Sequence, residues 1–566
     1  MKSGTTSSAA AGGNLITGRS AFLSLLRDEG VDRLFGNPGT TELPIMHALR
    51  SEPDMGYVLG LQEGIVIAMA DGYARASGRL AACNVHVAPG LGNAMGSLYN
   101  AKFWGSPVLV TAGQQEIGHG LTEPLLYDPL VPIAEPLVKW AAEVHRLEDL
   151  PRIVRRAAKV ALTPPTGPVF ISLPGDILNR AAALDLGSPT RVDAAGRPGD
   201  EALSRLAERL LRAERSVIVS GHEVATSDAL EEAARLAEVL GAPVYQQTVP
   251  YGAHFPSEHP AFLGALTRVQ KQVREALAPY DLAVFLGSDV LRMSVWSEIE
   301  PLPDGLPVVQ IGLRDWEMGK NYPAETAVRA DVKETLRALL PMLESGRNEA
   351  GRSAAADRIA AVADRNWAAK RARLRAAADE AEAKDPIAPA AAVRHLVDAL
   401  PLDVVFVDEG LTTSNTFLGQ YPFRDPQSYF GLASGGIGFA VAGAIGIHMA
   451  TPDRPCVALI GDGSAMYNVQ ALWTAAHLEL PITYVIANNR SYRILKDRLI
   501  AFHGDDNFVG MDFQSPRIDF VGLAESMGVS ARRVERAADL GDAVRESIAS
   551  GRPRLLDVTL SNGYDT

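Results

Sequence analysis

The last third of the sequence places a carboxylate and amide groups directly after two apolar segments. Asp462, Gly463 and Ser464 follow the segment CVALIG, and Asn489 follows the segment ITYVIAN. Because ligands collect at the carboxyl ends of strands in an open parallel sheet, both turns are predicted to reach one crevice. The glycines let a backbone approach closely, and the helix predicted after Gly463 offers free N–H groups to phosphate. A carboxylate, an amide oxygen, a backbone carbonyl and phosphate oxygens together suit Mg²⁺.

A Gly-Asp-Gly turn by itself is a weak signal, because such turns also occur in ordinary loops. The second polar turn, one strand–helix–strand unit further on, favours a metal and phosphate site. The pattern resembles the cofactor-binding motif of thiamine diphosphate-dependent enzymes. The resemblance implies thiamine diphosphate and Mg²⁺ as cofactors, with Asp462 and Asn489 as side-chain metal ligands and Ser491 as a ligand through its backbone carbonyl. The further cofactor contacts that it implies are Gly461, Gly463 and Ser464.

The segment ASGGIGFA matches the place where this family has a bulky aliphatic residue beneath the cofactor. Gly436 and Ile437 stand at that place. The resemblance implies that Ile437 holds the cofactor in a bent shape, with its amino group against the reactive carbon. By itself, Ile437 would equally be an ordinary core residue.

Glu63 interrupts a long apolar stretch, VLGLQEGIVIAMA, in the first third of the chain. A carboxyl group shielded from water is suited to sharing a proton with a ring nitrogen, although an acid at an exposed helix edge is the simpler alternative. The surrounding QEGIVIAMADGYAR is similar to the N-terminal block of the same family. This similarity implies that Glu63 activates the cofactor at its pyrimidine ring and comes from a partner subunit. A homodimer or homotetramer with sites shared between chains is therefore implied.

Several other stretches are similar to the benzoylformate decarboxylase branch of the family, among them FGNPGTTELP, GNAMG, TAGQQ, PLVKW and GPVFISLP. That branch implies a carboxy-lyase that converts an aryl or branched 2-oxo acid to an aldehyde through an enamine. His86, at the end of the predicted strand AACNVH, would relay protons, since imidazole exchanges protons near neutral pH. The segment APGLGNAMG that follows is expected to be a turn. Thr40 would hydrogen-bond the substrate carboxylate.

Three positions in the expected substrate pocket depart from that branch. Ser294 stands where the branch has a second histidine, and a serine hydroxyl is too weak an acid to replace it at neutral pH. Slower protonation would favour carboligation, so a 2-hydroxyacyl lyase or an acetohydroxyacid-synthase-like carboligase is the alternative function. Ile494 replaces a small residue. Arg498 replaces an aromatic residue and would clamp a carboxylate or phosphate, unless it belongs to a solvated basic helix face.

Strand-like and helix-like segments alternate along the chain, which predicts an α/β fold of three doubly wound parallel-sheet domains. These are a pyrimidine-binding domain at 16–190, a central domain at 200–342 and a diphosphate- and Mg²⁺-binding domain at 388–566. An Ala/Arg/Glu-rich segment at 353–384 predicts a helical linker on the surface, and residues 1–15 are expected to be disordered. The central segment lacks a G-x-G-x-x-G pattern, so a structural role is favoured there over nucleotide binding.

The 566 residues carry a formal net charge of −13 without a long basic run, which argues against a nucleic-acid or anionic-membrane surface. No apolar run reaches about 18 residues and no signal pattern begins the chain, so a cytoplasmic location is expected. Cys83 and Cys456 lie far apart in apolar segments and predict buried thiols. A 2-oxo acid or an aldehyde is the expected partner. An inactive binding protein with this fold is the alternative class, and the retained Glu63, His86 and Asp462 argue against it.

Overall fold

The computed structural model describes residues 15–294 and 296–564. The predicted disorder of residues 1–15 therefore lies, apart from Leu15, outside the described residues. The chain divides after residue 192 into two compact units, each of which is described by itself. Within the described residues, no helix is both long and apolar enough to cross a membrane.

The first unit contains a sheet of six parallel strands in the order β3-β2-β4-β5-β7-β6. Its inner strands are short apolar runs buried on both faces, as expected for a parallel sheet covered by helices. The strands are β2 (Arg33–Gly36), β3 (Gly56–Leu59), β4 (Ala81–His86), β5 (Val108–Gln114), β6 (Ala141–Glu143) and β7 (Val169–Pro174), and β1 (Ile16–Thr17) pairs separately with β8 (Ala181–Ala182). The helices are α1 (Gly18–Asp28), α2 (Leu43–Leu49), α3 (Glu63–Ser77), α4 (Val87–Trp104), α5 (Leu130–Ala134), α6 (Leu150–Leu162) and α7 (Gly175–Asn179).

The second unit begins with a central sheet, also of six parallel strands, in the order β11-β10-β9-β12-β13-β14. Helices α8, α10 and α12 bury their Leu and Ala side chains in one core with the sheet. The strands are β9 (Ser216–Ser220), β10 (Val244–Gln246), β11 (Phe262–Ala265), β12 (Leu282–Leu286), β13 (Val308–Gly312) and β14 (Thr326–Arg329). The helices are α8 (Asp200–Arg212), α9 (His222–Thr226), α10 (Leu230–Leu240), α11 (Gln270–Leu277) and α12 (Val332–Gly346).

The same unit ends with a third sheet of six parallel strands in the order β16-β15-β17-β18-β20-β19. Helix α17 is buried from Phe439 to His448, because apart from His448 its side chains are apolar. The strands are β15 (Val405–Glu409), β16 (Tyr429–Gly431), β17 (Cys456–Gly461), β18 (Ile482–Asn488), β19 (Ser530–Val534) and β20 (Arg554–Thr559). The helices are α15 (Pro389–Ala399), α16 (Thr412–Leu418), α17 (Phe439–Ala450), α18 (Asp462–Ala465), α19 (Ala471–His477), α20 (Arg493–His503), α21 (Phe520–Ser526) and α22 (Ala537–Ala549).

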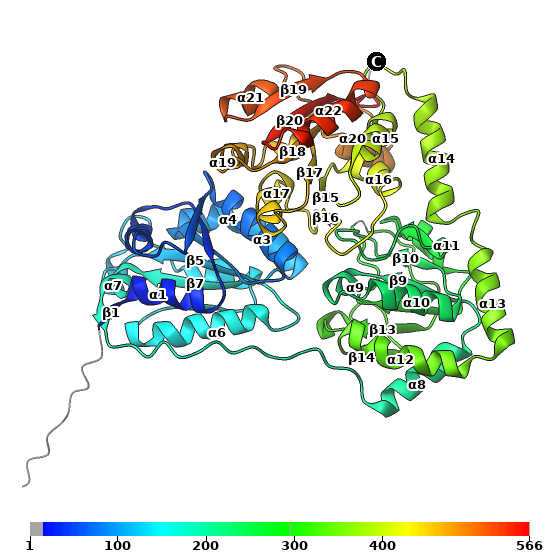
Figure 1. Cartoon of the computed structure of the whole chain (residues 1–566), viewed down its shortest axis with the longest axis horizontal. Coiled ribbons are helices and arrows are strands. Elements are labelled where there is room, and N and C mark those ends of the chain that lie inside the picture. Colours follow the sequence, from blue (N-terminus) through cyan, green and yellow to red (C-terminus); the bar gives the residue numbers. More distant parts are fainter. Residues whose placement is uncertain (1–14, 295, 565–566) are drawn as a thin grey trace, which may run out of the picture. The chain divides into compact units, whose positions relative to one another are not determined.

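Two helices, α13 (Glu349–Ala360) and α14 (Trp367–Glu380), connect the central and third sheets (Figure 1). Most of their side chains are exposed, but Trp367 is buried in the core of the central domain. Its indole N–H donates a hydrogen bond to the carbonyl of Leu418 at 3.1 Å, and Lys370 donates to the carbonyl of Leu263 at 2.7 Å. Helix α14 therefore contacts both domains of the second unit.

The prediction of three parallel-sheet α/β domains is confirmed. Cys83 and Cys456 are free and buried, as predicted. The expected turn after His86 was wrong, because APGLGNAMG lies inside helix α4. That helix begins at Val87 with a φ of 40°, a backbone conformation that β-branched residues rarely adopt.

A buried ion pair stabilises the first unit and gives a structural role to Asp71, the aspartate of the QEGIVIAMADGYAR segment. Both oxygens of Asp71 accept from Arg75, at 2.7 and 2.5 Å, and neither side chain is exposed to solvent. Asn100 donates to the same carboxylate at 3.2 Å, and the hydroxyl of Ser106 also donates to it. Because every oxygen lone pair has a nearby donor, this carboxylate is accommodated in a dry interior.

Replacing Asp71 with Asn should lower the free energy of unfolding by about 3–5 kcal/mol, because the charge of Arg75 would remain buried without a carboxylate. The matched control is Asp32→Asn, since Asp32 pairs with Arg33 and Arg79 on the surface. That variant should lose no more than about 1 kcal/mol. Urea unfolding followed by fluorescence measures both, and equal losses in the two variants would contradict the structural role of Asp71.

Candidate functional site

In the first unit, a fully buried carboxylate organises the carboxyl ends of strands β2, β4 and β5. Glu42 accepts the N–H of Gly39 at 2.9 Å and the N–H of Gly113 at 2.8 Å. The hydroxyl of Thr41 donates to it at 2.8 Å, and Nδ1 of His86 lies 2.8 Å from its Oε2. Because the carboxylate of Glu42 holds Nδ1 of the His86 ring, Nε2 is the nitrogen that can exchange a proton.

Close packing around His86 requires a glycine in the FGNPG turn. A Cβ atom on Gly39 would lie 2.2 Å from Nδ1 of His86, so a side chain there would displace the ring. Thr41 contacts His86, with 3.1 Å between Oγ1 and Nδ1. Thr40 lies in the same turn and is exposed.

Glu63 is the first residue of helix α3 and is only 7% exposed. Its Oε1 accepts from the amide of Asn37 at 3.2 Å, and its Oε2 accepts from the amide of Asn93 at 3.1 Å. A Cβ atom on Gly90 would lie 3.0 Å from Oε1. The carboxyl group is thus held in one position by two neutral donors, with no cation beside it within 4 Å among the described residues.

In the second unit, a cavity opens at the carboxyl ends of β15, β17 and β18, where the strand order of the third sheet reverses. It brings together most of the residues that the sequence predicted for the cofactor. Those that line it are Ile437, Gly461, Asp462, Gly463, Ser464, Asn489, Ser491 and Ile494, and Gly410, Leu411, Thr412, Ala487, Tyr492 and Arg493 complete the lining.

Asp462 has one buried oxygen without a partner. Its Oδ1 accepts the N–H of Gly463 at 2.8 Å, but its Oδ2 is buried and has no hydrogen bond. Burial raises the pKa of this carboxyl group to about 6. Since an unpartnered carboxylate oxygen in a buried site is costly, this atom fits a bound cation.

The other two predicted metal ligands, the amide oxygen of Asn489 and the backbone carbonyl of Ser491, are uncharged. Oδ1 of Asn489 accepts the N–H of Ser491 at 3.0 Å, which turns the backbone of that loop back toward Asp462. Residues 15–294 and 296–564 contain no cluster of three or more His, Cys, Asp or Glu that could hold a metal. The predicted set of one carboxylate, one amide and one backbone carbonyl is the kind of hard oxygen environment that suits Mg²⁺ with additional ligands from water or phosphate.

The backbone around this cavity departs from regular geometry. Helix α18 begins at Asp462, two residues before the predicted start at Ser464, and lasts only to Ala465. A Cβ atom on Gly463 would lie 2.6 Å from the ring of Tyr492, so the turn needs a glycine. Leu411 and Arg490 adopt φ values of 52° and 57° in the two adjoining loops. Such conformations cluster at sites where a loop must follow a ligand.

The loop that carries Ile437 is held by a buried acid. Glu409 accepts the N–H groups of Gly438 at 2.5 Å and Ala440 at 2.6 Å, which places Ile437 against the cavity. Burial raises the pKa of Glu409 to about 7, although these two N–H groups act in the opposite direction. Gly436 lies one residue before Ile437, and its N–H donates to the hydroxyl of Ser434 at 3.1 Å.

Two residues of the second unit that were predicted for the substrate pocket do not line this cavity. Ser294 is exposed on the loop after β12. Arg498 lies on α20, one helical turn beyond Ile494. Lys496 on the same helix is structural, since it is buried and its ammonium group lies 2.6 Å from Asp512.

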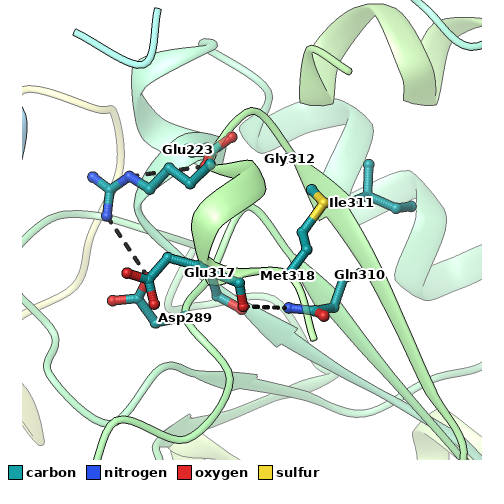
Figure 2. A pocket seen from close by; sticks show the side chains of 9 residues that line it. Glu223, Asp289, Gln310, Ile311, Gly312, Glu317 and Met318 are labelled. Atoms are coloured by element: carbon teal, nitrogen blue, oxygen red, sulfur yellow. Dashed lines mark hydrogen bonds and ion pairs between the residues drawn. The ribbon is translucent and has the colours of Figure 1, made fainter. Parts of the chain in front are cut away.

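A second crevice lies at the carboxyl ends of β9, β12 and β13 of the central sheet (Figure 2). It is filled by the protein's own charged groups. The guanidinium of Arg314 lies 3.9 Å from Glu223 and 3.8 Å from Asp289, and Glu223 also accepts the N–H of Leu313 at 2.5 Å. Only about 10 Å³ remains, enough for about one water molecule. This crevice therefore has no room for a nucleotide in the described conformation.

Sequence reasoning missed four residues that position the predicted groups. Glu42 orients His86, the amides of Asn37 and Asn93 hold Glu63, and Glu409 holds the Ile437 loop. Asn37, Glu42 and Asn93 lie within the FGNPGTTELP and GNAMG stretches, so their place in the sequence was visible although their partners were not. Glu409 had a weaker signal, as an acid at the end of the apolar segment VVFVDEG.

Three family models match the chain, in the same order as its sheets. They are the thiamine pyrophosphate enzyme N-terminal TPP binding domain at residues 16–124, its central domain at 203–339 and its C-terminal TPP binding domain at 410–558. Glu63 and His86 lie in the first match, and Asp462 and Asn489 lie in the last.

Relatives match over nearly the full chain. Benzoylformate decarboxylase of Pseudomonas aeruginosa is 34% identical, over 96% of this chain and 98% of that protein. The large subunit of acetolactate synthase isozyme 3 of Escherichia coli is 26% identical, over 96% and 95%. The solved structure of the thiamine diphosphate-dependent 4-hydroxybenzoylformate decarboxylase of Rhodococcus jostii RHA1 has 32% identity and a TM-score of 0.86, covering 96% of this chain and 99% of that one. With all three of its domains matched, the chain belongs to the thiamine pyrophosphate enzyme family, among its decarboxylases and acetolactate synthase-like enzymes.

Proposed function

We propose that this protein is a Mg²⁺- and thiamine diphosphate-dependent carboxy-lyase that converts an aryl or branched 2-oxo acid to an aldehyde, with carboligation as a second outcome. The observation that carries the proposal is the 34% identity to a benzoylformate decarboxylase over 96% of the chain. The unpartnered Oδ2 of Asp462, in a cavity shared with Asn489 and Ser491, supports it.

Each group in the second unit has a task in this proposal. Asp462 and Asn489 bind Mg²⁺ through their side chains and Ser491 through its carbonyl, while the Gly461–Ser464 turn holds the diphosphate. Ile437 supports the cofactor from below, and Glu409 keeps Ile437 in place. When bound, thiamine diphosphate supplies a nucleophilic carbon for the keto group and accepts the electron pair left by CO₂.

The first unit supplies the proton transfers. Glu63, held by Asn37 and Asn93, exchanges a proton with the pyrimidine ring of the cofactor. His86 donates to Glu42 through Nδ1, so its Nε2 is free to protonate the product carbon. Thr40 hydrogen-bonds the substrate carboxylate, and Thr41 supports the ring of His86.

We also propose that the active protein is a homodimer or homotetramer in which Glu63 of one chain serves the cofactor of another. The resemblance to the family supports this arrangement. The cytoplasmic location expected from the sequence stays a prediction.

Carboligation is the second candidate because two observations favour it. Acetolactate synthases match this chain over more than nine-tenths of its length. Ser294 stands where the decarboxylase branch has a histidine, so fewer groups can protonate the product carbon. A product carbon that is protonated slowly has time to attack a second carbonyl, as in the lyase and acetohydroxyacid-synthase-like alternatives.

The test is turnover by the purified protein supplied with Mg²⁺ and thiamine diphosphate. Benzoylformate, pyruvate and a branched 2-oxo acid should each be offered with and without benzaldehyde, and the products identified by mass. We expect benzaldehyde and CO₂ from benzoylformate. Hydroxyketones as the main product would favour the carboligase, and no product from any substrate with the cofactor bound would contradict both.

Replacing Glu63 with Gln should lower kcat at least about a hundredfold, because an amide cannot exchange a proton with the ring. The affinity for thiamine diphosphate, measured by calorimetry, should change little. The control is Glu52→Gln, which alters a partly exposed acid paired with Arg27 in the same unit. Near-normal kcat in the Glu63 variant would rule out its role in activation.

Replacing His86 with Ala should lower kcat for aldehyde release by about a hundredfold to ten-thousandfold, the usual contribution of a positioned acid or base. His47→Ala is the matched control, because His47 is exposed on α2. Rapid-quench analysis separates the steps: CO₂ should still be released in the first turnover while aldehyde formation slows. If both steps slow equally, His86 does not act in protonation.

A further inference from the structure

The backbone of Val87 is strained, directly beside one of the two groups proposed for proton transfer. Strand β4 ends at His86 and helix α4 begins at Val87, with no loop residue between them. The φ of Val87 is 40°, and within residues 15–294 and 296–564 it is the one β-branched residue with a positive φ. A branched side chain makes this conformation costly, so the surrounding structure must hold it in place.

A direct connection from strand to helix does not by itself require this strain. Strand β7 runs directly into α7 at Gly175, and β17 runs directly into α18 at Asp462. Neither Gly175 nor Asp462 has a positive φ. Glycine would adopt the φ of Val87 without strain, but it would lack the side chain, which is fully buried in the structure. The buried side chain is therefore what valine adds to this turn.

Helix α4 connects the ring of His86 to the carboxyl group of Glu63. Asn93 of α4 donates to Oε2 of Glu63 at 3.1 Å, and it lies six residues, or about 9 Å along the helix, beyond Val87. On the other side of Val87, Nδ1 of His86 lies 2.8 Å from Glu42. A change in the angle at which α4 leaves β4 would therefore move one of these contacts relative to the other.

We propose that Val87 is a positioning residue, whose buried side chain fixes the angle between β4 and α4 and thereby the position of His86 relative to Glu63. This inference rests on the proposed function, because it takes these two residues as the groups that transfer protons. Such groups must be held closely, since a displacement of about 1 Å can lower a rate a hundredfold. Close packing of the branched side chain limits the rotation of the turn, and backbone strain is the cost of this restraint.

Thermal unfolding tests the strain by comparing alanine with glycine. Val87→Ala and Val87→Gly both remove the buried methyl groups, but only glycine also relieves the backbone. Tm should therefore be about 2–6 °C higher for Val87→Gly than for Val87→Ala. The matched control is Val154, a fully buried valine of α6 without a positive φ. There the order should reverse, because glycine destabilises an ordinary helix relative to alanine. The lower Tm for glycine at both positions would overturn the proposal.

A spectroscopic measurement without cofactor or substrate tests the placement of His86. Nitrogen NMR on the intact protein with labelled histidine should show one tautomer of the neutral His86 ring, with the proton on Nδ1 facing Glu42. The His86 signals are those missing from the His86→Ala variant. Val87→Gly should give a mixture of tautomers, whereas Val154→Gly should keep the single form. Unchanged His86 signals in Val87→Gly would contradict the positioning role.

Turnover distinguishes this inference from the proposed function. Val87→Gly should lower kcat for aldehyde release about tenfold to a hundredfold while KM changes less than about twofold, because the substrate still binds but the proton donor is misplaced. Val154→Gly should keep kcat within about twofold. If no 2-oxo acid is turned over but the tautomers still respond to Val87→Gly, the decarboxylase proposal fails and the positioning role stands. Normal kcat in an active Val87→Gly variant would overturn the positioning role alone.

Discussion

A carboxylate buried away from water must be matched by donors, and this requirement organises both units of the protein. Glu42, Glu63, Asp71 and Glu409 are each less than 8% exposed, and every one of their carboxylate oxygens accepts a hydrogen bond. The donors are backbone N–H groups, amides, hydroxyls or a guanidinium. Some are close in the sequence, as Arg75 is to Asp71, and others come from distant segments, such as Gly113 and Gly438. Each acid therefore links segments that lie far apart along the chain. Asp462 is the exception, since its Oδ2 lacks a donor, and this is the atom where a cation fits.

The sheet topology explains why these acids gather where they do. All three sheets are parallel, and the order of their strands reverses next to β2 and β4, β9 and β12, and β15 and β17. Loops leaving the carboxyl ends of these strands diverge and leave space between them. In the first and third sheets that space holds Glu42, His86 and the Asp462 cavity. In the central sheet Arg314 and two acids fill it. The same architecture thus gives two candidate sites and one crevice that is closed by internal ion pairs.

The two groups proposed for proton transfer are each held by neighbouring side chains. Nδ1 of His86 lies 2.8 Å from the buried Glu42, and Glu63 accepts from the amides of Asn37 and Asn93 at 3.2 and 3.1 Å, which suits groups that must act on one atom.

The sequence alone determined the three-domain α/β fold and the family, because apolar strand periodicity and the GDG and NN turns depend only on local order along the chain. It also predicted which residues would gather around Asp462. It did not identify Glu42, Asn37, Asn93 or Glu409, since a hydrogen bond between distant loops leaves no local pattern. It mistook the start of α4 for a turn because glycine and proline there favour both. Only the tertiary structure showed that Lys496 is buried beside Asp512, because this contact joins two segments whose pairing leaves no local pattern.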